Sequence, residues 1–351
     1  MRQYNRTKLT KEGLFKASLY SYRSNHGQFN SVWGNTDYGW PMNLFLNKKP
    51  LLEGEEQRTI AKVYFTAFLD ATLKNKKKYI PVFKDYRYAA SWLPEDVYVS
   101  RYADNKIIHL CTFEEDVDVT SGTQPGVTIK AENFKLWKEY DMKSRQGGTK
   151  ENNTLTLGWR NDTSTVVDSI KTNKMDTIPN YIVNFPYGLL KEYDINKKAY
   201  LTFSAANTKE NIPEGKSNKS DRQDDLNSLA LNSLRDSRDE EGENKEKEDL
   251  PIQVDFSVKL KDAEGNIASI ALSEFAYIPP VMESKFIKWG VMNSRYGEDY
   301  EVTLQDFRIP LNSFTENNPE LQIDKLVEIA FVFDKTPEGA VVIDDIGLSK
   351  N

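Results

Sequence analysis

The sequence has 351 residues, of which 38% are hydrophobic, and a formal net charge of −6. This length predicts two domains, and 17 Phe, 18 Tyr and 6 Trp residues are ample material for a core. An acidic chain without a basic stripe is not expected to bind nucleic acid. No stretch approaches the roughly 18 apolar residues of a membrane span, so none is predicted.

The first thirteen residues are basic and polar, and no apolar segment follows them. No signal peptide is therefore predicted, and the localisation stays open. The single cysteine, Cys111, allows no internal disulfide and is expected to be a buried strand residue.

The first elements in chain order are a strand, a loop and a helix. Residues 14–22 are predicted to form the strand, residues 23–30 the loop that carries His26, and residues 53–75 the helix. Between loop and helix, residues 31–52 are irregular and rich in aromatic side chains, with Trp33, Tyr38, Trp40, Pro41 and Phe45.

The helix carries an apolar stripe at helical spacing: Ile60, Val63, Tyr64, Ala67, Phe68 and Ala71. The residues before it are too few to supply a sheet. The stripe is therefore expected to pack on the second domain or to remain an exposed patch that promotes association.

From residue 97 the pattern changes to short β-rich runs separated by turn residues, which predicts an all-β sandwich. The expected strands are 97–102, 106–113, 126–136, 154–160, 164–170, 180–185, 199–204, 252–260, 267–277, 301–309, 326–333 and 340–346. The turn at residues 261–266 predicts a hairpin. Residues 207–249 are almost devoid of apolar side chains and are expected to be a disordered acidic insertion within this domain.

The loop Asn25-His26-Gly27-Gln28-Phe29-Asn30 resembles the histidine loop of secreted bacterial α/β-hydrolases of the esterase and lipase kind. In that family the loop follows the last strand and precedes the final helix. The resemblance implies that residues 1–90 are the C-terminal remnant of a hydrolase domain. It also implies that His26 occupies the position of the catalytic base.

The rest of the catalytic apparatus is missing from the sequence. No Gly-x-Ser-x-Gly elbow occurs, and no Asp precedes His26. Asp37 follows the histidine, so it is interpreted as a loop residue. An incomplete triad should not hydrolyse esters at a useful rate, because nucleophile and base act as a unit.

The segments 305–314, 326–334 and 341–349 resemble the last strands of jelly rolls of the carbohydrate-binding-module kind. The expected fold is therefore mainly β, a jelly-roll sandwich over residues 97–351 preceded by a small α/β fragment. The resemblance also implies a structural Ca²⁺ between Glu114 and Asp345, since hard oxygen ligands suit this ion. The alternative is that both are surface acids in water. No cofactor is expected for catalysis.

Sugar binding would require exposed aromatic rings. The candidates are Trp137, Trp159, Tyr181 and Trp289, although such a ring is more often a core residue than a platform in a sandwich.

Three functions remain open at this stage. The first is a hydrolase fragment, inactive alone, that works with an upstream hydrolase polypeptide. The second is a non-catalytic module that binds a glycan or a protein, and the third is a purely structural sandwich. Whether the chain acts as an ester hydrolase is left undecided.

Overall fold

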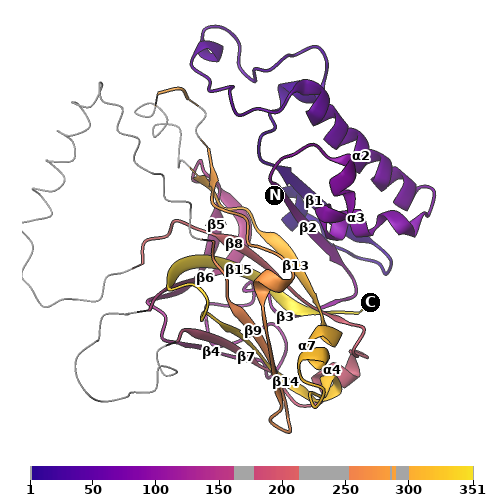
Figure 1. Ribbon diagram of the computed structural model, residues 1–351, viewed down its shortest axis with the longest axis vertical. Helices are drawn as coiled ribbons and strands as arrows, with labels where there is room; N and C mark the ends of the chain where they lie inside the picture. The colour runs from indigo at the N-terminus through magenta and orange to yellow at the C-terminus, as the bar shows by residue number, and fades with distance from the viewer. Residues whose placement is uncertain (1, 162–177, 213–252, 285–286, 290–299, 351) are drawn as a thin grey trace, which may run out of the picture.

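The computed structural model describes residues 2–161, 178–212, 253–284, 287–289 and 300–350. An N-terminal unit contains α1 (Arg2–Arg6), β1 (Phe15–Ser21), α2 (Gly54–Thr72), α3 (Pro81–Lys84) and β2 (Tyr98–Asp104). Short 3-10 turns lie at Gly27–Phe29, Met42–Leu44, Lys77–Tyr79 and Tyr86–Trp92. Figure 1 shows α2 and α3 on one side of the β1–β2 ribbon and the sandwich on the other.

The predicted long helix is α2. A capping box fixes its start, since the backbone N–H of Glu53 donates to the Glu56 carboxylate at 2.9 Å. Of the apolar stripe, Ile60, Ala67 and Ala71 are buried. They pack on β1, β2 and α3 through the side chains Phe15, Val82, Phe83, Tyr98 and Tyr102.

The ribbon beneath α2 is a pair of strands that are distant in sequence. β1 and β2 run antiparallel, with Leu19 opposite Ser100 and Ser18 opposite Arg101. Successive side chains of a strand point to opposite faces, so Tyr98 and Tyr102 face α2 while Arg101 faces the sandwich. The second strand under α2 therefore comes from after the helix. The buried part of the stripe packs on this ribbon and on α3 rather than on the two sandwich sheets, and Phe68 remains 45% exposed.

The sandwich consists of two antiparallel sheets. One has the strand order β10-β9-β14-β7-β4, and the other β13-β8-β15-β6-β5 with β3 also paired to β15. In chain order the bounds are β3 Ile107–Cys111, β4 Thr128–Glu132, β5 Leu136–Lys143, β6 Thr149–Arg160, β7 Asn180–Asn184, β8 Tyr200–Asn207, β9 Ser257–Asp262, β10 Ile267–Ala271, β13 Gln305–Pro310, β14 Leu326–Val332 and β15 Glu338–Ser349. A small ribbon joins β11 (Met282–Glu283) to β12 (Tyr300–Glu301), and short helices form at α4 (Leu189–Glu192) and α7 (Leu311–Asn317).

The core lies between the two sheets and is rich in aromatic rings. Phe333 is 4.4 Å from Trp159 and 4.9 Å from Phe256 between ring centroids, and Phe203 is 5.1 Å from Phe331. Cys111 is fully buried on β3, as predicted. The expected mainly β, jelly-roll sandwich is confirmed.

Several predicted segments differ from the structure in detail. The expected strand 126–136 covers β4, and β5 was not predicted beyond its first residue. The hairpin at residues 261–266 is confirmed by the pairing of β9 with β10. The expected strand 164–170 lies outside the described residues, as does the proposed insertion beyond residue 212. Within the described ranges, no helix is long and apolar enough to cross a bilayer.

Candidate functional site

The aromatic loop, defined here as residues 25–47, is tied to the start of α2. Asp37 accepts hydrogen bonds from the backbone N–H groups of His26 at 3.1 Å and Gly27 at 2.7 Å. A Cβ on Gly27 would lie 2.8 Å from the carbonyl oxygen of Gly34, so the loop closes tightly on this glycine. Arg58 of α2 donates to the carbonyl oxygen of Gln28 at 3.2 Å. These contacts give an irregular segment a fixed shape.

The far end of the loop is joined to the sandwich. Leu46 forms a β-bridge with Ile287, and the backbone N–H of Lys288 donates to the carbonyl oxygen of Phe45 at 2.9 Å. The ring of Phe45 lies 5.4 Å from that of Trp289. The aromatic loop and residues 287–289 thus form one continuous surface.

This surface exposes large aromatic rings. The exposed fractions are 61% for Trp33, 60% for Tyr38, 81% for Trp40 and 54% for Trp289. Apart from His26, Asp37 is the only acidic or basic residue of the loop, and its carboxylate is already engaged by backbone donors. The surface is therefore aromatic and close to neutral, a combination typical of an interaction site.

His26 lies at the edge of this surface. His26 is exposed, and its ring makes an edge contact with Trp33 at 5.2 Å between centroids. Asp37 contacts the backbone of His26 rather than its imidazole. Among the described residues no serine, cysteine or carboxylate is hydrogen-bonded to the ring, so the position predicted for a catalytic base has no partner there.

The other aromatic residues predicted to bind sugars are distributed differently. Trp159 and Tyr181 are fully buried between the sheets, and the indole N–H of Trp159 donates to the carbonyl oxygen of Thr336 at 2.9 Å. Trp137 is partly buried against the same core. A buried ring cannot stack on a sugar in this conformation, so of the four candidates Trp289 alone is positioned as a platform.

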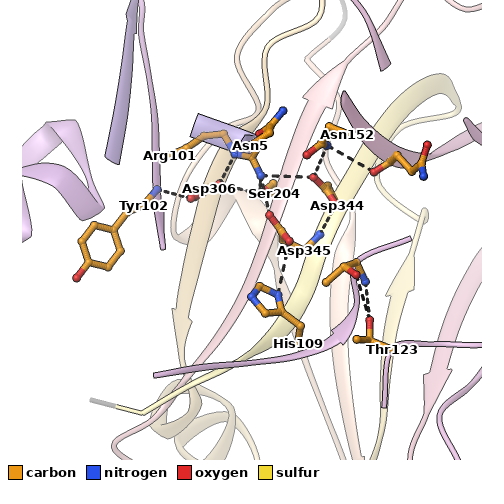
Figure 2. Close-up of polar contacts among 12 residues, drawn as sticks. Asn5, Arg101, Tyr102, His109, Thr123, Asn152, Ser204, Asp306, Asp344 and Asp345 are labelled. Carbon is orange, nitrogen blue, oxygen red and sulfur yellow. Dashed lines mark hydrogen bonds and ion pairs between the residues drawn. The ribbon is translucent and has the colours of Figure 1, made fainter. Parts of the chain in front are cut away.

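A cluster of charged residues lies where the N-terminal unit meets the sandwich. Figure 2 shows Arg101 of β2 pointing among Asp306 of β13 and the adjacent Asp344 and Asp345 of β15. The N–O distances from its guanidinium to these carboxylates are 3.3, 3.4 and 2.7 Å respectively. The side chain of Arg101 is only 2% exposed.

The remaining contacts of this cluster complete its coordination. Asn152 donates to Asp344 at 2.7 Å, Ser204 donates to Asp306 at 2.7 Å, and the Tyr4 ring centroid lies 5.0 Å from the guanidinium carbon. The backbone N–H of Tyr102 also donates to Asp306, at 2.5 Å. The free edge of β2 is thus bonded to side chains of the sandwich.

A bulge in β15 explains how two consecutive acids reach one arginine. The pairing of β15 with β8 shifts register between Asp344 and Gly347, and Asp345 has a positive φ of 52°. In a regular strand the two side chains would point to opposite faces, and a bulge redirects one of them. Burial, and then the Asp345 charge, raise the pKa of Asp344 well above its usual value, and burial likewise raises the pKa of Asp306.

The residues predicted to hold calcium are engaged with other donors. Both carboxylate oxygens of Glu114 accept hydrogen bonds from Asn153, at 2.6 and 3.1 Å. Asp345 pairs with Arg101, and its other oxygen lies 3.5 Å from Nδ1 of His109. No group of three or more potential ligands that could hold a metal ion occurs among the described residues. The donor set therefore does not fit a calcium ion in this conformation.

No protein-family model and no curated protein matches this chain. Solved structures with a similar sandwich include a family 30 carbohydrate-binding module, 12% identical, covering 69% of this chain and 98% of that one at a TM-score of 0.33. A family 11 carbohydrate-binding module of a cellulosomal cellulase of Clostridium thermocellum is 11% identical over 70% of this chain and 95% of that one, at a TM-score of 0.31. An exo-β-agarase is 9% identical over 69% of this chain and 25% of its own, also at 0.31. At these TM-scores the likenesses carry no argument about function.

Sequence reasoning noted the aromatic residues of the loop but did not propose them as a binding surface. The available signal was their density, with Trp33, Tyr38 and Trp40 between glycines and one proline. The Arg101 cluster had no comparable signal, because its acids lie more than 200 residues away in sequence.

Proposed function

We propose that this chain is a non-catalytic accessory module that binds a neutral glycan through the aromatic loop and Trp289. The observation that carries the proposal is the exposure of Trp33, Trp40 and Trp289 on a surface anchored at both ends. Flat indole rings held in place can stack on the apolar faces of sugar rings without first being ordered.

The charge of the loop favours a sugar over other ligands. A nucleic acid or an anionic lipid surface would require Lys or Arg side chains, and the loop contains none. It does contain the exposed neutral amide of Asn35, which can donate to and accept from hydroxyl groups.

Affinity electrophoresis of the full chain against neutral polysaccharides such as β-glucan, xylan and agarose tests this proposal. Trp40→Ala and Trp289→Ala should each weaken binding about tenfold, as expected for a central aromatic contact. Trp92→Ala is the matched control, because Trp92 is 53% exposed outside the loop. No retardation by any polysaccharide, or equal weakening by the control, would contradict the assignment.

A second candidate function is favoured by the outer face of α2. Phe65, Leu69 and Leu73 are 69%, 48% and 79% exposed, although the opposite face of the helix is already buried. A helix that is apolar on both faces is normally covered on both. We infer that this face docks a hydrolase polypeptide that supplies the nucleophile and acid missing around His26.

An ester hydrolysis assay tests this docking hypothesis. The chain alone should not hydrolyse short-chain aryl esters above background, because no described side chain activates a nucleophile beside His26. Coexpression with a hydrolase polypeptide that carries a Gly-x-Ser-x-Gly elbow and the catalytic acid should give turnover that His26→Ala abolishes. Turnover by the chain alone, or none after coexpression, would exclude the docking hypothesis while leaving the glycan hypothesis intact.

A further inference from the structure

The joint between the N-terminal unit and the sandwich brings three acidic side chains together. Asp306, Asp344 and Asp345 come from two strands of the same sheet and converge on one point. Asp344 is 2% exposed and Asp306 13% exposed, so water cannot screen them effectively. Buried carboxylates without a cation are strongly unfavourable.

The cation at this point belongs to the chain itself. Arg101 reaches all three carboxylates, and its planar guanidinium can donate in several directions at once. The Tyr4 ring of α1 covers it from outside, and Asn5 contacts it at 3.5 Å. The chain's own side chains thus enclose the guanidinium.

We propose that Arg101 is the permanent counter-ion of Asp306, Asp344 and Asp345, and that the joint between the N-terminal unit and the sandwich therefore needs no bound metal ion. In this conformation the bulge turns Asp345 toward Arg101, while Glu114 is bonded to Asn153. The guanidinium thus supplies next to Asp345 the positive charge that the sequence analysis assigned to calcium.

Thermal unfolding of the full chain provides the first test. Melting temperatures in 5 mM calcium chloride and in 5 mM EGTA should agree within about 1 °C, since a ligand stabilises only where it binds the folded state. A rise of about 3 °C or more in calcium would overturn the proposal.

Substitutions provide the second test, which does not depend on calcium. Arg101→Met should lower the melting temperature by about 10 °C, because it leaves buried carboxylates unpaired. Adding Asp344→Asn and Asp345→Asn to Arg101→Met should restore at least half of that loss. Arg87→Met is the matched control, since its pairing with Asp85 lies near the surface, and it should shift melting by no more than about 2 °C.

The combined variant keeps the proposal testable if Arg101→Met alone does not fold. A folded triple variant then supports the counter-ion role, because neutral amides at positions 344 and 345 no longer need the cation. A triple variant that is no more stable than Arg101→Met would overturn it.

Discussion

At the scale of single residues, the contacts of a polar or aromatic side chain decide whether it lies in the core or at the surface. Trp159 and Trp289 are the same residue type, yet one donates to Thr336 inside the core and the other lies half in solvent beside Phe45. Asp37 likewise satisfies backbone donors rather than the imidazole of His26. The chemistry of these residues follows from their contacts and not from their type.

Glu139 of β5 is a residue whose protonation should be visible in stability. Burial, and then the nearby charge of Glu115, raise its pKa from 4.5 to about 7, and one carboxylate oxygen is buried without a hydrogen-bond partner. The pKa of Glu139 is higher in the folded state than in the unfolded state. The folded state is therefore stabilised by protonated Glu139 below about pH 4.5, and this stabilisation is lost as the pH rises through 7.

Glu139→Gln should remove this pH dependence. We expect the variant to be more stable than the wild type by about 1 kcal/mol at pH 8, allowing for the partial exposure of the side chain, and to show no such gain at pH 4.5. Urea unfolding between pH 4.5 and 8 measures the difference. Glu132→Gln, an exposed change on β4, serves as the control, and an equal gain in both variants would contradict this assignment.

At the scale of elements, α2 has two apolar faces with different roles. The Ile60 face holds the N-terminal unit together through Leu52 and Tyr98, whereas the Phe65 face contacts little of the chain. A single stripe was evident from the helical spacing of the sequence. The second apolar face became apparent only in the structure, where the first face is buried and Phe65 is not.

Two alanine substitutions separate these faces. Ile60→Ala should destabilise the protein by about 2–3 kcal/mol, because it opens a cavity at a side chain that is 3% exposed. Phe65→Ala should change the unfolding free energy by less than about 0.5 kcal/mol, since that ring is 69% exposed. Chemical denaturation of both variants gives the comparison, and a similar cost for the two would show that the Phe65 face is also buried in solution.

At the scale of the whole molecule, the sequence predicts what is local and misses what is distant. Alternation along residues 254–260 and the turn that follows predict the β9–β10 hairpin, because a strand and its neighbour lie within a few residues. The β1–β2 ribbon was not predicted, because its paired residues Ser18 and Arg101 are separated in sequence by the whole of α2. The aromatic loop was visible as composition, but its attachment at Leu46 to Ile287 was not.

The long span of the Arg101 contacts has a consequence for the order in which the protein is made. Arg101 leaves the ribosome more than 240 residues before Asp344 and Asp345. During translation the N-terminal unit therefore carries an unneutralised guanidinium, and the ribbon face that will meet the sandwich has nothing to cover it. Contacts of such sequence separation form late and slowly. The N-terminal unit is thus synthesised first but is among the last parts to fold completely. It acquires its final stability only when β15 is in place.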